Sequence, residues 1–102
     1  MRQQDYIVET RLFYIDKNLH ELCELRWTGS PGEPGGKWYR GALTWKRWKP
    51  VEKSLLAAVE DGQTIKVYYQ DEEGGNNLTV AWANRDEDSA NAWKKRVVAN
   101  KF

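Results

Sequence analysis

Residues 65–70 read Ile-Lys-Val-Tyr-Tyr-Gln, a run of β-branched and aromatic residues that predicts a strand. A similar run occurs earlier in the chain, where Arg11-Leu12-Phe13-Tyr14 matches Lys66-Val67-Tyr68-Tyr69. Trp38 and Trp93 are separated by the same interval as Arg11 and Lys66, and Leu19 and Leu78 by a slightly longer one. The difference in spacing falls in turns, as is typical of a repeated structural unit. The chain therefore contains two similar units.

Strand patterns extend outward from these runs and cover most of the chain. The predicted strands are residues 5–16, 19–25, 38–45, 54–59, 65–70, 78–83 and 92–98. The glycine-rich and polar segments 28–36, 71–77 and 84–91 predict loops. The fold class is therefore all-β, and four strands in a repeat of roughly 40–50 residues are typical of a β-propeller blade.

We expect residues 1–102 to form a single domain of two four-stranded blades, about 5–49 and about 50–102. Two blades cannot close a ring, so we expect three chains to assemble into a six-bladed propeller, a homotrimer. The alternative is a small β-sandwich or open barrel whose two halves merely look alike.

Composition excludes several classes of protein. The chain has 102 residues, enough for one domain, and its 16 basic and 15 acidic residues leave a net charge of +1. This balance gives no general attraction to nucleic acid or to an anionic membrane, and no apolar run is long enough to insert into one. No signal peptide is visible at the start, which leaves the localisation open, with cytoplasmic location or leaderless secretion both compatible.

The cysteine and aromatic counts carry further information. Cys23 is the only cysteine, so it cannot form an internal disulfide, and we expect a buried free thiol. With one histidine in addition, the chain has no Cys/His metal site. Six tryptophans and five tyrosines exceed what a small core needs, so we expect some of them to face a ligand or a partner.

Taken in order, these segments resemble a known family. The segments are RLFY (11–14), LHELC (19–23), KWYRGAL (37–43), LLAAV (55–59), IKVYYQD (65–71) and LTVAW (78–82). They resemble the fungal and bacterial fucose-binding propeller lectins over roughly residues 10–98. The resemblance implies two blades per chain, trimerisation, and sugar sites between adjacent blades. One blade supplies an arginine, a glutamate and the backbone of a small residue, and the next blade supplies two aromatic residues.

Carried onto this chain, the resemblance assigns one complete sugar-binding site. Arg11, Glu21 and Ala42 stand at the positions of the arginine, the glutamate and the small residue. Trp82 and Trp93 stand at the positions of the two aromatic residues.

The second site assigned in this way is degenerate. Lys66 replaces the arginine, Thr79 the glutamate and Val97 the small residue. Trp38 is the one aromatic residue retained, because Glu24 stands where the other would be. We therefore predict one working site per chain.

The expected function is a lectin for L-fucose or a related sugar on fucosylated glycans, without a metal or another cofactor. A tryptophan ring suits the C–H face of a sugar, and an arginine and a carboxylate suit its hydroxyl groups. Assembly would make the protein multivalent.

Three alternatives stay open beside the lectin. The first is a protein-interaction or structural module with decayed sites, in which Arg11 and Glu21 are a surface ion pair. The second is an enzyme acting on glycans, which we do not expect, because only Glu21 stands near the predicted pocket and such chemistry needs two carboxylates. The third is a nucleic-acid patch at residues 44–49 (TWKRWK), for which a connector strand between blades is the preferred interpretation.

Overall fold

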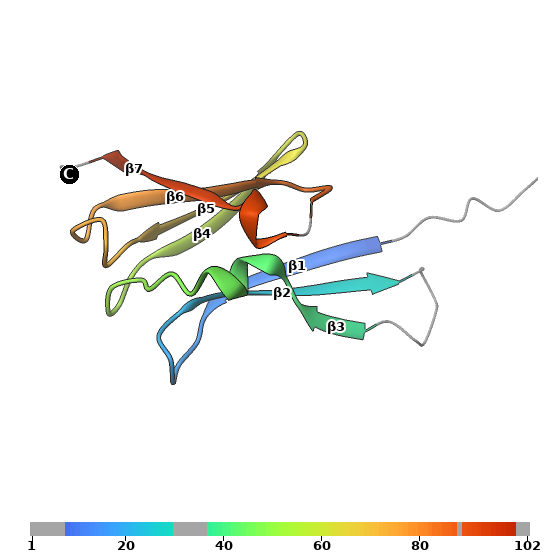
Figure 1. The fold of residues 1–102 in the computed structure, drawn as a ribbon, viewed down its shortest axis with the longest axis horizontal. Coiled ribbons are helices and arrows are strands. Elements are labelled where there is room, and N and C mark those ends of the chain that lie inside the picture. The colour runs from blue at the N-terminus through green and yellow to red at the C-terminus, as the bar shows by residue number, and fades with distance from the viewer. Residues whose placement is uncertain (1–7, 30–36, 88, 100–102) are drawn as a thin grey trace, which may run out of the picture.

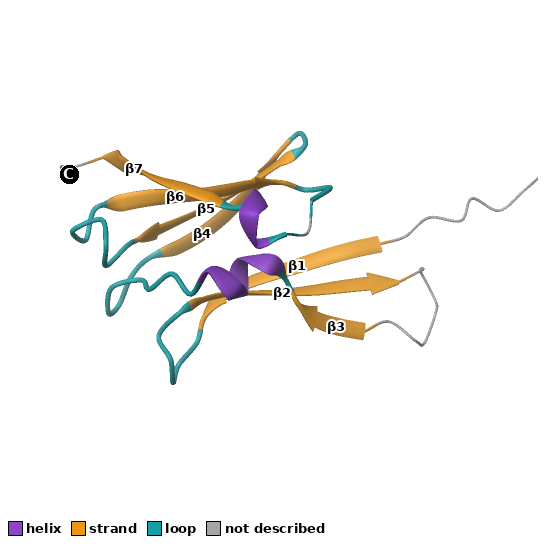
Figure 2. Ribbon diagram, viewed as in Figure 1, coloured by secondary structure: helices purple, strands orange, loops and turns teal. Residues whose placement is uncertain are grey.

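The computed structural model describes residues 8–29, 37–87 and 89–99 and contains two antiparallel sheets. The first sheet has the order β1-β2-β3, formed by β1 (Val8–Ile15), β2 (Leu22–Gly29) and β3 (Lys37–Arg40). The second has the order β4-β5-β6-β7, formed by β4 (Leu56–Asp61), β5 (Thr64–Gln70), β6 (Leu78–Asn84) and β7 (Lys94–Ala99). Two short 3-10 helices, η1 (Ala42–Lys46) and η2 (Ala90–Ala92), complete these elements. The predicted all-β class is thus confirmed (Figure 2).

The two sheets stack on a shared apolar core, with η1 and η2 at the level between them (Figure 1). On β5 the burial alternates strictly, so that Ile65, Val67 and Tyr69 point into the core. Leu22 from β2 and Leu43 from η1 reach the same core from the other side. Burial of each such side chain contributes roughly 1.5–3 kcal/mol, so contact between the sheets stabilises both of them. Each sheet therefore has an inner face on the core and an outer face directed away from it.

Strands β4 and β7 begin two residues later than predicted, and the start of the predicted strand 5–16 lies outside the described residues. Two further differences change the site, and both lie next to a turn. Strand β2 begins at Leu22 instead of Leu19, because the Asp16 carboxylate accepts hydrogen bonds from the backbone N–H groups of Asn18 and Leu19, at 2.8 and 2.7 Å. These bonds close a tight turn, and His20 leaves it with a φ of 58°. Strand β3 ends at Arg40, and residues 42–46 form η1 instead of continuing the predicted strand 38–45.

The strand pairing corrects the match between the two units. Ile15 pairs with Leu22 in the first sheet, and Gln70 pairs with Leu78 in the second. Since Ile15 and Gln70 are separated by the same interval as Arg11 and Lys66, Leu22 corresponds to Leu78, and Leu19 does not. This change in register decides which glutamate faces the core.

The segment between the sheets is an irregular connector and not the predicted connector strand. It contains one isolated bridge, between Pro50 and Asp71. The ring centroid of Trp48 lies 5.2 Å from Lys46 Nζ and 4.8 Å from Lys95 Nζ. Since Lys95 belongs to β7, these cation–π contacts attach the connector to the second sheet.

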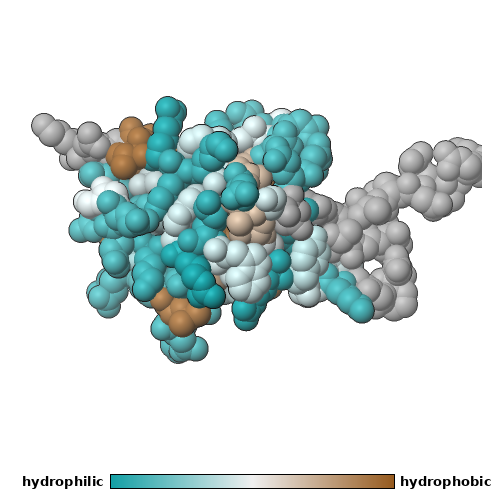
Figure 3. Space-filling view, viewed as in Figure 1, coloured by the Kyte–Doolittle hydropathy of each residue, from teal (hydrophilic) through white to brown (hydrophobic). Residues whose placement is uncertain are grey.

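Hydrophobic residues form only small separate patches on the face seen in Figure 3, which looks onto the edges of both sheets. Within the described ranges, no helix has the length and apolar character needed to cross a membrane.

Candidate ligand-binding cleft between the sheets

Alternation along β1 and β2 places a basic and an acidic side chain on the inner face of the first sheet. Arg11 pairs with Arg26, and Phe13 pairs with Glu24. Directly paired residues share a face, so Arg11 and Glu24 are diagonal neighbours on the face that meets the second sheet.

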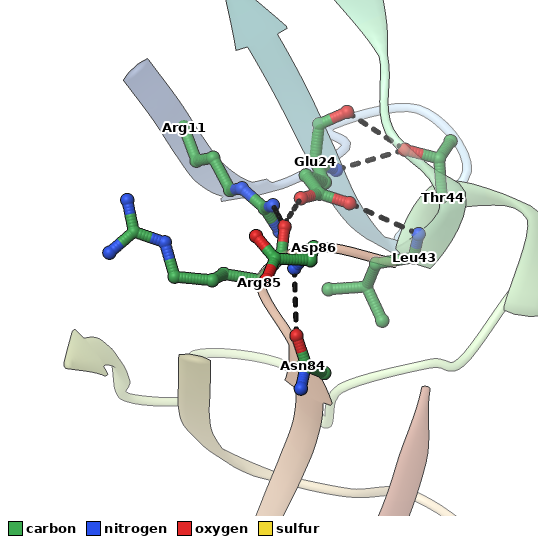
Figure 4. A network of polar contacts seen from close by, with 7 residues as sticks. All are labelled: Arg11, Glu24, Leu43, Thr44, Asn84, Arg85 and Asp86. Atoms are coloured by element: carbon green, nitrogen blue, oxygen red, sulfur yellow. Dashed lines mark hydrogen bonds and ion pairs between the residues drawn. The ribbon is translucent and has the colours of Figure 1, made fainter. Parts of the chain in front are cut away.

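Arg11 and Glu24 form a buried ion pair, with 3.2 Å between Arg11 Nη1 and Glu24 Oε2 (Figure 4). Only 7% of the Arg11 side chain and 1% of the Glu24 side chain are exposed. The other carboxylate oxygen of Glu24 accepts a hydrogen bond from the Leu43 N–H at 3.2 Å. Arg11 Nη2 donates to the carbonyl oxygen of Arg85, at 2.5 Å, in the loop after β6. One guanidinium thus joins the two sheets.

Gly41 leaves the space that the Glu24 carboxylate occupies. A Cβ atom at Gly41 would lie 2.2 Å from Glu24 Oε1 and 2.3 Å from its Cδ, closer than atoms can approach. Because its φ of −78° is open to any residue, the glycine is required for this contact alone. The Gly41 N–H also donates to the Glu24 carbonyl oxygen at 2.8 Å, which holds the two backbones together.

A cleft of about 180 Å³ opens between the sheets beside this ion pair. Arg11 and Phe13 line it from β1, and Glu60 and Arg85 line it from the second sheet. Glu60 and Arg85 form an exposed ion pair, with 3.0 Å between Glu60 Oε1 and Arg85 Nη1. The remaining lining residues are apolar: Ala58, Val59 and Ile65. The cleft thus offers hydrogen-bond donors, one carboxylate, an aromatic ring and an aliphatic wall to a small polar ligand.

The structure brings together some of the residues predicted for the first site. Ala42 begins η1 and lies next to Leu43, which contacts Glu24. Trp93 lies in the core, 2% exposed, and its ring meets that of Phe13 edge to face with 6.0 Å between the centroids. Trp93 therefore supports the Phe13 ring from behind and presents almost no surface to a ligand.

Glu21 and Trp82 lie away from Arg11. Glu21 precedes β2 and forms an ion pair with Arg47, with 3.5 Å between Glu21 Oε1 and Arg47 Nη1. Trp82 pairs with Lys66 and lies on the outer face of the second sheet. In their places, Glu24 contacts Arg11 and Phe13 provides the aromatic ring of the cleft.

The residues predicted for the second site are also dispersed. Lys66 lies on the outer face of the second sheet, whereas Thr79 is buried on the inner face, paired with Tyr69 and with Val97. Trp38 belongs to the other sheet and is 53% exposed.

Glu21 lines a smaller hollow, together with Tyr14 and Cys23. Burial raises the pKa of the Cys23 thiol and also that of the Tyr14 hydroxyl. The prediction of a buried free thiol at Cys23 is confirmed. Among the residues that the structure describes, no group of three or more His, Cys, Asp or Glu side chains could hold a metal ion.

From the sequence, Glu24 was assigned to an aromatic position of the second site and not to the place beside Arg11, because the predicted strand began three residues early. The signal that would have placed Glu24 beside Arg11 is Asp16 followed by Lys-Asn, a side-chain-capped turn that delays the next strand.

No known protein family, characterised protein or solved structure matches this chain.

Proposed function

We propose that the protein is a lectin that binds L-fucose or a related sugar in the cleft between its two sheets, without a metal. The observation that carries the proposal is the Arg11 side chain in the wall of that cleft, held in place by its buried ion pair with Glu24. Glu24 is too deeply buried to reach a ligand, and it acts as a positioning residue that holds the Arg11 guanidinium. A fixed guanidinium suits sugar recognition because it carries five N–H donors, more than its contacts with Glu24 and Arg85 use.

The other walls of the cleft complement the remaining surface of such a sugar. The Phe13 ring and the Ala58 and Ile65 side chains offer apolar surface to a C–H face and a methyl group. Glu60 at the rim can accept hydrogen bonds from hydroxyl groups, and Arg85 beside it can donate them. Both groups are partly exposed, so a ligand can replace their mutual contact at little cost.

The test is calorimetric titration with L-fucose in the presence of a chelator. The double variant Arg11→Met/Glu24→Gln removes both charges of the buried pair, a change that often leaves the free energy of unfolding nearly unaltered. Its glutamine keeps an acceptor for the Leu43 N–H. We expect this variant to fold and to lose fucose binding. Glu21→Gln is the matched control and should bind as the parent does, because Glu21 lies away from the cleft. Undiminished binding by the double variant would contradict the proposed site.

We further propose that chains assemble head to tail, as a ring of three. The inner face of the first sheet carries Arg11, and the second sheet covers it. The corresponding face of the second sheet is its outer face, which carries Lys66 and is uncovered. The outer face of the first sheet exposes Leu12 (51%) and Trp38 (53%). Repeating the stacking found within the chain would place the Lys66 face against the Leu12 face of the next chain, a head-to-tail contact that can close a ring.

The mass in solution tests this assembly. Three times the chain mass of 11.9 kDa is expected for the parent, and a smaller particle for Leu12→Lys. A monomeric parent would refute the ring. A ring that binds no fucose would refute the lectin and favour an interaction or structural module.

A further inference from the structure

The outer face of the second sheet contains a groove of about 400 Å³, larger than the cleft between the sheets. We call it the outer groove. Strands β5, β6 and β7 all contribute to it, and its lining residues are Thr64, Lys66, Tyr68, Val80, Trp82, Arg96 and Val98.

The pairing of these strands gives the outer groove an apolar floor and basic sides. Val80, only 7% exposed, forms the floor between Tyr68 on β5 and Arg96 on β7, with which it pairs. Trp82 is the next residue of β6 on this face, and Lys66 lies directly opposite it. Two aromatic rings and two cationic groups thus surround one hollow.

The charge of the outer groove is poorly compensated. Lys66 approaches Asp61 at 3.5 Å, but the Asp61 side chain is 74% exposed, and exposed pairs of this kind are weak. Arg96 has no carboxylate partner among the residues that the structure describes.

The corresponding positions on the inner face of the first sheet include a carboxylate, which the outer groove lacks. Lys66 corresponds to Arg11, and Tyr68 corresponds to Phe13. Phe13 pairs with Glu24, whereas Tyr68 pairs with Val80, so Val80 stands where the first unit has Glu24. Gly41 and Arg96 are separated by as many residues as Arg11 and Lys66, so Arg96 corresponds to Gly41. The second unit therefore has no carboxylate beside its basic residue and carries a guanidinium where the first unit has a glycine.

We infer that the outer groove binds a sugar bearing a carboxylate, such as a uronic acid. Arg96 can donate two parallel hydrogen bonds to a carboxylate, and Lys66 adds a second positive charge. The rings of Tyr68 and Trp82 offer apolar surface to the C–H face of the sugar. The class of ligand, a saccharide, rests on the proposed function, whereas the required negative charge rests on the residues of the groove. In the proposed ring the outer groove lies where one chain meets the next, so the assembled protein is the sample to test.

The probe is methyl β-D-glucuronide, and methyl β-D-glucoside is its neutral control. Both are titrated at low ionic strength and followed by the tryptophan indole resonances in NMR spectra. We expect the glucuronide to bind at least tenfold more tightly than the glucoside and to weaken as salt is added. Lys66→Gln/Arg96→Gln should lose at least tenfold in affinity, because charge-assisted hydrogen bonds are removed. Lys17→Gln removes a positive charge from a distant exposed turn and should change nothing.

L-Fucose is titrated into the same samples, which separates the two claims. Fucose binding without glucuronide binding would overturn this inference and leave the proposed function intact. Glucuronide binding that requires Arg96, in a protein that ignores fucose, would support this inference and refute the proposed specificity. Equal affinity for glucuronide and glucoside would overturn the role of charge. Tighter binding of a short oligothymidylate would overturn the choice of a sugar and assign the outer groove to single-stranded nucleic acid.

Discussion

Replacing Gly41 by alanine tests whether the Glu24 carboxylate is held as tightly as its contacts suggest. The new Cβ would stand 2.2 Å from Glu24 Oε1, against about 3.5 Å for an ordinary contact, so the carboxylate would have to move by roughly 1 Å. It cannot do so and keep its bonds to both Arg11 and Leu43, each 3.2 Å long. Overpacking costs about 1–3 kcal/mol, and losing a hydrogen bond to a charged group about 1.5–3 kcal/mol. We therefore expect Gly41→Ala to lower the free energy of unfolding by roughly 3–5 kcal/mol, the range for breaking a buried ion pair.

Urea unfolding followed by circular dichroism measures this loss, and a second background isolates its cause. In the variant Arg11→Met/Glu24→Ala the obstructing side chain is gone, so adding Gly41→Ala should cost under about 1 kcal/mol. Gly62→Ala is a control for backbone conformation alone, since Gly62 has a φ of 63° and no atom within 4 Å of the added Cβ; it should cost on the order of 1 kcal/mol. An equal loss from Gly41→Ala in both backgrounds would refute the reasoning.

Glu24→Gln should lower the free energy of unfolding by roughly 3–5 kcal/mol, because it removes the carboxylate charge that faces the buried Arg11 guanidinium. Glu21→Gln, whose partner Arg47 is 61% exposed, should cost under about 1 kcal/mol. Similar losses for the two variants in urea unfolding would contradict the assigned positions. Asp16→Ala should destabilise the protein at neutral pH. Hydrogen bonds from two backbone N–H groups lower the pKa of the Asp16 carboxyl in the folded protein. The ionised carboxylate therefore stabilises the fold above pH 3.8, the ordinary pKa, and this stabilisation is lost as the pH falls through the lower pKa of the folded state. The difference between Asp16→Ala and the parent should therefore vanish in strong acid, and a constant difference would speak against it. Cys23 should react with a thiol reagent slowly at pH 8 and rapidly in urea, because burial shields the thiol and raises its pKa; fast labelling of the native protein would count against its buried position.

Strands with a strong alternating pattern could be predicted from the sequence. Strand β5 is the clearest case, because Ile65, Val67 and Tyr69 alternate with polar or half-buried residues and each enters the core. Strand β4 was found from a short apolar run, although three of its apolar residues, Ala57, Ala58 and Val59, are exposed. For β5 the local pattern suffices, since the period of two is a property of the extended backbone itself.

The candidate site was harder to predict, because it depends on where a strand begins. The sequence from Leu19 to Leu25 alternates as a strand does, yet hydrogen bonds to Asp16 hold its first residues in a turn. An error of three residues reverses the faces of a strand, and it exchanged Glu21 for Glu24 as the partner of Arg11. The role of Phe13 depends likewise on contact between the sheets, which no local pattern contains.

The steric contact between Gly41 and Glu24 has a consequence for how such a chain can change over generations. An arginine at position 41 cannot be accommodated while the Glu24 carboxylate fills that space, whereas a glycine is harmless once the glutamate is gone. The second unit carries both changes, with Val80 and Arg96 at the corresponding positions. If both units arose from one ancestral repeat with the glutamate and the glycine, the loss of the carboxylate had to come first, and the guanidinium could enter only afterwards. A duplicated copy would thus have passed through an intermediate with a single basic residue, lacking both the carboxylate and the second cation, before it acquired the groove seen today.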